Sequence, residues 1–206
     1  MDQSVIDSLK KWPNVPLCFG WLALDRRGDW RMRNEFAQEH HLPGDIIRHE
    51  ALKVFIERNY ARDALGRFFF QNGPQRVHIS LDYTPWVLRL LPSQNTTWKL
   101  KTTQGHDIIP LGCLIDELGN VLIEADFPIF QESATSETGF ESIKLRSIAL
   151  LHHHDLEIFS GMSTIQINAC NFGGHFGWMG QKIPIEQIYS QDIAARFKFN
   201  PKPASH

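Results

Sequence analysis

Three stretches of the chain repeat apolar residues every three to four positions, the spacing that places them on one face of a helix. They are residues 4–12, residues 45–60 and residues 183–197. Asp45 is suited to cap the second stretch, and Pro184 is suited to the first turn of the third. The pattern predicts about three helices, although the Val-Phe-Ile centre of residues 45–60 is also compatible with a strand.

Most of the remaining chain alternates apolar and polar positions, which is the period of a strand with one buried face. A hairpin is predicted around residues 25–28, and a second around Asn72-Gly73, the strongest short hairpin signal. Short alternating segments continue over residues 68–125 and resume in residues 143–151 and 163–170. We therefore expect an α+β fold, in which an antiparallel meander forms a curved sheet or open barrel with about three helices.

The tetrad D-x-x-G occurs three times, at residues 25–28, 63–66 and 116–119. The spacings between the three copies are unequal, which argues against a repeat array. Aspartate stabilises a turn through its neighbouring backbone, and glycine adopts the left-handed conformation that closes it. The motif therefore predicts three turns of one kind.

Length and composition place this chain among ordinary globular proteins. It has 206 residues, a formal net charge of −2 and three cysteines, none of them in a C-x-x-C pair. A chain of this length can bury a sufficient core without a metal or a disulfide. We expect one domain over residues 1–206, with a mobile loop near residues 131–142 and a frayed tail near residues 200–206.

The composition also argues against several classes of protein. A nearly neutral chain has no general attraction for nucleic acid. No apolar run approaches the roughly 20 residues that span a bilayer, and the N-terminal residues lack the apolar region of a secretory signal. Scattered cysteines suit a reducing compartment. We therefore expect a cytoplasmic protein that binds neither nucleic acid nor a membrane.

Three segments in the first half of the chain resemble a known family. They are WPNVPLCFGWLALDRRGDWRMR, FIERNYARDALGRFFFQNGPQRV and DYTPWVLRL, and the run RNYARDALGRFFFQNGPQRV is the most distinctive. Together they are similar to a family of uncharacterised proteobacterial proteins, a domain of unknown function. The resemblance implies a bacterial source and no assigned activity, and it supplies no catalytic residues.

The segment LLHHHDLEIF contains the main candidate for a chemical site. In one unbroken strand over residues 148–158, His152 and His154 would point together into an apolar layer. With His175 as a third ligand, these imidazoles could bind a divalent transition metal such as zinc, iron or nickel. The competing interpretation is a turn between two strands, stabilised by Asp155, with the histidines partly solvated. No established metal-motif spacing supports the first interpretation.

Three further motifs have both a functional and a structural interpretation, and we favour the structural one in each case. NFGGHFGWMG is either a flexible loop that presents aromatic rings to a flat ligand or a crossover whose aromatics pin it to the core. DRRGDWRMR is either a nucleic-acid contact or a hairpin that buries Trp30 and Met32. Cys170 could pair with His175 as a nucleophile, but a thiol in an apolar strand usually acts as a small apolar side chain.

The sequence thus predicts a binding or accessory module for a small ligand or a protein, without a cofactor. The alternative is a metal-dependent hydrolase or oxygen-using enzyme with His152, His154 and His175 as metal ligands. A third possibility is a structural subunit that forms a homodimer through an aromatic face. The motifs identify no catalytic residues and no residues that bind an organic cofactor.

Overall fold

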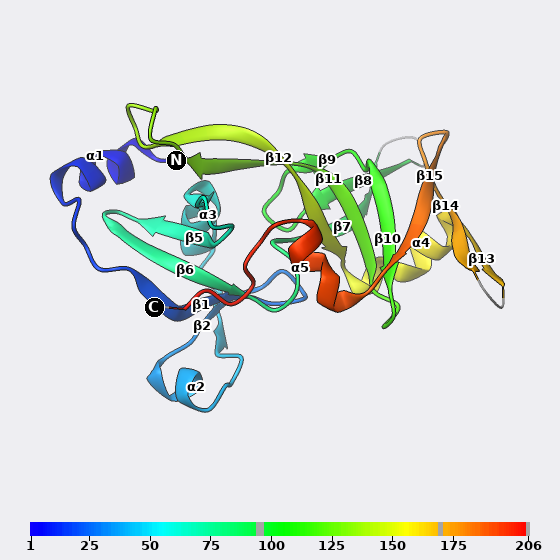
Figure 1. Cartoon of the computed structure of the whole chain (residues 1–206), viewed down its shortest axis with the longest axis horizontal. Helices are drawn as coiled ribbons and strands as arrows, with labels where there is room; N and C mark the ends of the chain where they lie inside the picture. Colours follow the sequence, from blue (N-terminus) through cyan, green and yellow to red (C-terminus); the bar gives the residue numbers. More distant parts are fainter. Residues whose placement is uncertain (94–96, 169–170, 205–206) are drawn as a thin grey trace.

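Strands are the predominant element of the protein. The computed structural model describes residues 1–93, 97–168 and 171–204 (Figure 1). The strands are β1 (Cys18–Leu24), β2 (Trp30–Met32), β3 (Asp45–Ile46), β4 (Tyr60–Arg62), β5 (Phe68–Asn72), β6 (Gln75–Leu81), β7 (Trp86–Pro92), β8 (Trp98–Thr102), β9 (Asp107–Ile108), β10 (Gly112–Asp116), β11 (Val121–Glu132), β12 (Phe140–Leu151), β13 (Ser163–Asn168), β14 (Asn171–Trp178) and β15 (Gln181–Ile188). They form one 15-stranded sheet.

The sheet is mixed, and the predicted antiparallel meander is wrong. Its main order is β13-β14-β15-β10-β11-β4-β5-β6-β1-β2-β3, and β12, β7, β8 and β9 branch from β11. The pairs β1·β6, β10·β15, β11·β4 and β12·β7 are parallel. Over the described part of the chain the order does not return to its first strand, so the sheet is open. Alternation reports which face of a strand is buried but not which partner the strand takes, so the pattern could not reveal these long-range pairs.

The described residues contain five α-helices, against about three predicted. They are α1 (Gln3–Lys11), α2 (Glu35–Glu39), α3 (Glu50–Arg58), α4 (Leu156–Met162) and α5 (Ile193–Arg196). The first predicted helix is confirmed by α1. The second is confirmed only from Glu50, because Asp45 lies in β3 and His49 caps the helix instead. No helix among the described residues has the length and apolarity that crossing a bilayer requires.

The predicted helix over residues 183–197 is wrong in its first half, which forms strand β15. Ile183 and Ile185 are buried in the alternation typical of a strand. Strand β15 pairs with β14 up to Pro184 and with β10 from Ile185 onward. Pro184 therefore lies where β15 passes from one neighbouring strand to the other. Proline lacks an N–H and is tolerated where a ladder is interrupted. The spacing of the isoleucines fits the period of a helix and that of a strand. Pairing with β14 and β10 places the segment in the sheet as a strand.

The three D-x-x-G motifs form the same turn, as predicted, and each closes a hairpin. In each turn the glycine N–H donates to the aspartate carbonyl, and the aspartate Oδ1 accepts from two backbone N–H groups. Gly28, Gly66 and Gly119 have φ values of 83°, 73° and 80°, which L side chains rarely adopt. These turns connect β1 to β2, β4 to β5 and β10 to β11.

Gly66 is expected to tolerate a side chain less well than Gly119. A Cβ at Gly66 would lie 2.5 Å from the carbonyl oxygen of Lys198, whereas a Cβ at Gly119 would have no heavy atom within 4 Å. Positive φ alone costs each alanine variant about 1–2 kcal/mol, and the backbone clash adds about 1–3 kcal/mol at Gly66. Chemical denaturation of Gly66→Ala and Gly119→Ala measures the difference. Equal losses would contradict the packing of the C-terminal segment against the turn that contains Gly66.

The core is aromatic at its centre, and a long hairpin runs through it. The Trp86 and Phe127 rings stack with centroids 4.4 Å apart, and Tyr60 and Phe68 meet the Trp86 ring edge to face. Figure 1 shows an elongated molecule with α1 at one end, β13 and β14 at the other, and β11 and β12 running between the two halves. The long strands therefore tie the two ends into one sheet.

Two segments that were expected to be irregular are more regular than predicted. Strand β11 reaches Glu132 and β12 begins at Phe140, so the connection between them is shorter than the predicted loop at residues 131–142. The backbone of Asn200 donates to Gly66, and the carbonyl of Pro201 accepts from Leu81. The beginning of the tail is thus bonded to the sheet.

Candidate functional site

An apolar pocket lies between helix α3 and strands β1, β2, β5 and β6, where α3 packs beside β5 (Figure 1). Its volume is about 500 Å³. Its lining residues are Cys18, Trp21, Leu22, Met32, Ile47, Leu52, Phe55, Ile56, Phe70, Asn72, Gln75 and Val77. Among these described residues, the one ionisable side chain is a cysteine. A mostly apolar pocket of this size with few polar groups is typical of a small-molecule site.

The pocket has a buried floor and a partly open mouth. Leu22, Ile56 and Phe70 are buried, whereas Trp21 is 39% exposed and Met32 is 45% exposed. Met32 was predicted to be buried, and this prediction is wrong because β2 ends at Met32 beside the open pocket. Large exposed apolar side chains that gather at the mouth of a pocket indicate a binding site, whereas single scattered ones do not.

Helix α3 forms one wall because its apolar residues recur at helical spacing. Leu52, Phe55 and Ile56 face the pocket, and Val54, on another face, is 45% exposed. The Phe55 ring meets the Phe70 ring edge to face at 5.3 Å. This contact fixes the distance between the helix and the sheet and so keeps the pocket open.

The few polar groups of the pocket suit binding better than chemistry. Desolvation raises the pKa of the Cys18 thiol, so the thiol remains protonated at neutral pH and is a poor nucleophile. Asn72 and Gln75 flank the β5–β6 turn and can offer hydrogen bonds at the edge of the pocket. The arrangement can hold and orient an uncharged molecule.

The histidine run lies at the end of β12 and leads into a helix. His152 is bonded through its N–H to Leu88, and its Nδ1 accepts from the backbone of His154. Residues 153–155 form a short 3₁₀ turn, and α4 follows from Leu156. The unbroken strand over residues 148–158 is therefore wrong, and so is a turn between two strands. The segment is a strand-to-helix turn capped by His152.

Asp155 stabilises this turn, as the second interpretation predicted. Its Oδ2 accepts from Arg89 Nε at 2.7 Å and from the backbone N–H of Leu90 at 2.9 Å, and its Oδ1 accepts from Arg89 Nη2 at 3.2 Å. The carboxylate is buried. The Asp155 carboxylate therefore joins the turn after β12 to strand β7.

The proposed metal ligands are only partly brought together. One nitrogen from each of His152, His153 and His154 lies within 4.8 Å of the others. His175 is not part of this group in the described residues, and it lies on β14 opposite Thr164 and Pro184.

The electrostatics at the histidine run oppose a cation. Desolvation, followed by the positive charge of Arg89, lowers the pKa of His152 to about 4. Desolvation, His154 and the nearby Arg27 and Arg89 lower the pKa of His153. The imidazoles of His152 and His153 are therefore neutral at neutral pH and could ligate, but Arg27 and Arg89 disfavour added positive charge there, an effect that the Asp155 carboxylate only opposes.

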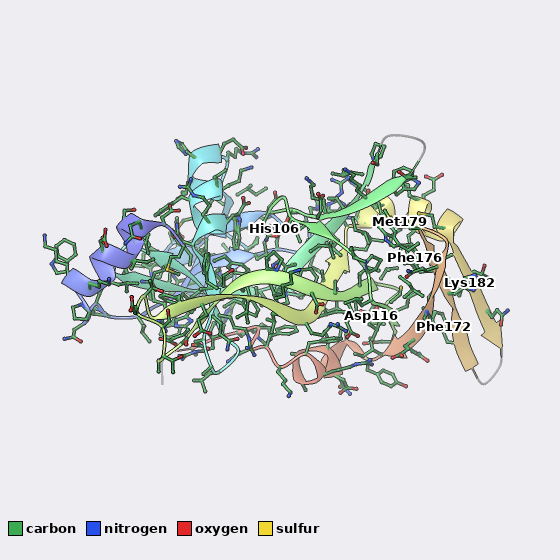
Figure 2. The ribbon with its side chains drawn as sticks, turned by 90° about the horizontal axis from the view of Figure 1, so that it is seen from above. His106, Asp116, Phe172, Phe176, Met179 and Lys182 are labelled. Carbon is green, nitrogen blue, oxygen red and sulfur yellow. The ribbon has the colours of Figure 1, made fainter. Side chains whose placement is uncertain are left out.

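The glycine-rich segment at residues 171–180 is mainly strand β14 and not a loop. Phe176 and Trp178 are buried, so their rings face the core, as the structural interpretation expected. Figure 2 shows Phe172, Phe176, Met179 and Lys182 together toward one end of the molecule, with Asp116 labelled beside them on the side of the molecule's middle. The pairing of β14 with both β13 and β15 leaves no free aromatic loop here.

The two cysteines that the structure describes, Cys18 and Cys113, give no sign of nucleophilic chemistry. Burial raises the pKa of Cys113 to about 12, which keeps its thiol protonated. Cys170, considered as a partner of His175, lies outside the described residues.

The apolar pocket itself was not predicted. The signal for it was the apolar face of residues 52–56 opposite a hairpin with Trp21 and Met32, which the sequence alone could not place together.

Comparison with known proteins gives a family and no activity. The sequence profile of the family described as "Protein of unknown function (DUF2946)" matches residues 1–204. A solved DUF1285 family protein from Silicibacter pomeroyi DSS-3 is 16% identical, with a TM-score of 0.44 and 85% of each chain covered. A DUF1285 family protein from Shewanella baltica OS155 is 12% identical, with a TM-score of 0.41, covering 68% of this chain and 91% of that one. A search of curated proteins found no match.

Proposed function

Since the chain belongs to the family described as "Protein of unknown function (DUF2946)", which confirms the predicted membership of an uncharacterised family, we propose a function from the pocket itself. The protein is a binding module that holds an uncharged, apolar small molecule between α3 and the β1–β2 and β5–β6 hairpins. The observation that carries this proposal is a hollow of about 500 Å³ with an almost entirely apolar lining. Its volume is in the range of pockets that enclose a drug-sized ligand.

Binding, and not catalysis, follows from the chemistry of the lining. General acid–base catalysis needs a histidine, carboxylate or amine within hydrogen-bond reach of the reacting group. The described lining contains none of these, and its thiol has a raised pKa. Burial of apolar surface, at about 25 cal/mol per Å², would supply most of the affinity. A charged ligand would lose its hydration without gaining an ionic partner.

The occupancy of the pocket can be measured with phenylnaphthylamine, an uncharged apolar dye. We expect saturable binding with one dye per chain and energy transfer from Trp21, which stands at the mouth. Val77→Trp places an indole inside the pocket and is expected to weaken binding about tenfold or more, because an overpacked site loses more than about 1.4 kcal/mol.

Val54→Trp is the matched control, because Val54 lies on the same helix as the pocket wall but outside the lining. The control is expected to bind like the wild type. Thermal melts establish that both variants fold. Trp21→Ala is a second test, because it removes the large side chain at the mouth of the pocket. The proposal is wrong if the wild type shows no saturable binding, or if Val77→Trp binds as tightly as Val54→Trp.

A further inference from the structure

Three segments that are far apart in the sequence meet at a second pocket. The D-x-x-G turn between β1 and β2, the turn between β10 and β11, and the histidine run surround a hollow of about 350 Å³. Its lining residues are Arg26, Arg27, Asn120, Val121, Leu150, Leu151, His153 and Leu156. The pocket is distinct from the apolar pocket beneath α3, with which it shares no lining residue.

In the part of the chain that the structure describes, Arg26 and Arg27 have no acidic ion-pair partner, unlike most arginines of this protein. Arg31, Arg67 and Arg89 each pair with a buried aspartate at 2.7 Å. Between the residues that the structure describes, no ion pair involves Arg26 or Arg27. The Arg26 guanidinium lies 4.2 Å above the Tyr83 ring. Stacking uses the face of the guanidinium and leaves its N–H edges free to donate.

Two aspartates near these arginines are hydrogen-bonded within and beside their own turns, and neither forms an ion pair with Arg26 or Arg27 in the described part of the chain. Asp25 accepts from Arg31 and from two backbone N–H groups of its own turn. Asp116 accepts from the Tyr83 hydroxyl, from the Asn120 side chain and from two backbone N–H groups. Burial raises the pKa of the Asp116 carboxyl, but hydrogen bonds from Tyr83, Asn120 and the backbone outweigh it and lower the pKa. The aspartates of both turns are thus held by their own turns and neighbours, and among the described residues the guanidinium groups of Arg26 and Arg27 make no hydrogen bond, so their N–H groups are available to a ligand.

Four of the other six lining residues are apolar. Val121, Leu150 and Leu151 are buried residues of β11 and β12, and Leu156 begins α4. An inorganic ion would contact only the arginine side, whereas a molecule with a hydrocarbon or aromatic part would also cover the leucines. Paired guanidinium groups recognise the oxygens of phosphate and carboxylate through charge-assisted hydrogen bonds.

We propose that this pocket binds a small organic oxyanion, with its phosphate or carboxylate group on Arg26 and Arg27 and its apolar part on the leucine floor. Asn120 and His153 complete the rim. The first D-x-x-G turn is thus a binding element as well as a hairpin connection.

Titration calorimetry with three probes tests the site: phenyl phosphate, benzoate and benzyl alcohol. Phenyl phosphate or benzoate is expected to bind at one site per chain, and benzyl alcohol, which lacks the charge, at least about tenfold more weakly. Tighter binding of phenyl phosphate than of benzoate assigns the site to phosphate esters, and the reverse order assigns it to carboxylates.

The double variant Arg26→Gln/Arg27→Gln is expected to weaken binding of the anion about tenfold or more, because it removes charge-assisted hydrogen bonds. Both residues are exposed, so the variant should fold, as circular dichroism can verify. Arg48→Gln is the matched control, since Arg48 is also exposed but does not line the pocket. Val77→Trp should leave anion binding unchanged, which separates this site from the proposed function.

Three outcomes would overturn the proposal. The first is that neither anion binds, and the second is that benzyl alcohol binds as tightly as the anions. The third is that Arg48→Gln weakens binding as much as the double variant, because the attraction would then be a property of net charge and not of the pocket.

Discussion

Acidification from pH 6.5 to pH 4 is expected to lower the free energy of unfolding by about 3 kcal/mol through one side chain, His78. His78 is fully buried on β6. Its ring is stacked on Phe19 at 4.5 Å and meets the Phe69 ring at 5.8 Å. Neither ring nitrogen has a hydrogen-bond partner among the described residues. Such a site accommodates neutral imidazole and excludes imidazolium.

The direction of the pH effect follows from the pKa. Desolvation is the main cause that lowers the pKa of His78 from 6.5 to about 4; Arg67 and Arg76 act in the same direction, and Asp63 and Glu132 oppose them. Below pH 6.5 the unfolded chain binds a proton that the folded chain does not. Stability is therefore fully present above pH 6.5 and is lost as the pH falls toward 4.

The His78→Leu variant isolates this effect. We expect its free energy of unfolding to fall less steeply than that of the wild type between pH 6.5 and pH 4, because the titrating group is gone. His40→Leu, which removes an exposed histidine, is the control for the loss of an imidazole. Urea denaturation across this pH range measures all three proteins. Parallel curves for the wild type and His78→Leu would show that His78 is protonated in the folded protein, contrary to the burial described.

The Asp155→Ala variant is expected to lose about 3 kcal/mol of stability. The change removes the acceptor of a buried backbone N–H, which costs about 1–3 kcal/mol, and leaves Arg89 without its partner. Breaking a fully buried ion pair costs about 3–5 kcal/mol, but the Arg89 side chain is 36% exposed, which reduces that part of the loss. Chemical denaturation at pH 7 measures the change.

Asp126→Ala is the matched control for this prediction. Asp126 also pairs with an arginine at 2.7 Å, but its side chain is 40% exposed and that of Arg146 is 55% exposed. A surface pair of this kind contributes about 0–1 kcal/mol. Equal losses in the two variants would mean that the turn after β12 is not held by its buried carboxylate. Asp155→Asn, which retains acceptor oxygen, should fall between Asp155→Ala and the wild type.

Local features of the fold were predictable where neighbouring residues decide them. The turns of the D-x-x-G motifs, the hairpin at Asn72-Gly73 and the first helix depend on spacing and backbone preference within a few residues. The parallel pairs β1·β6 and β10·β15 depend on segments that are remote in sequence. The isoleucines of β15 fit a helix and a strand equally well, so only the neighbouring strands could decide its structure.

The site was less predictable than the fold, for a related reason. Asp155 was recognised as the stabilising residue of its turn from its residue type, but its partners Arg89 and Leu90 lie on β7, remote in sequence, and could not be predicted. The apolar pocket combines residues from α3 with residues from four strands, none of which carries a chemical motif. The arginines of the first turn lie beside His153 and Leu156, which are far along the chain, so the sequence alone could not place them in one pocket. Apolar and shape-based sites leave little trace in a single sequence.

The methyl signals of the methionines test the central claim most directly. The chain has four methionines, and of these Met32 alone lines the apolar pocket. In protein labelled with carbon-13 at the methionine methyl groups, titration with phenylnaphthylamine should shift the Met32 signal to saturation at one equivalent and leave Met162 and Met179 unchanged. Met179 is 70% exposed and reports nonspecific adsorption. An unchanged Met32 signal, or a shift at Met179 of equal size, would contradict an apolar ligand site beneath α3.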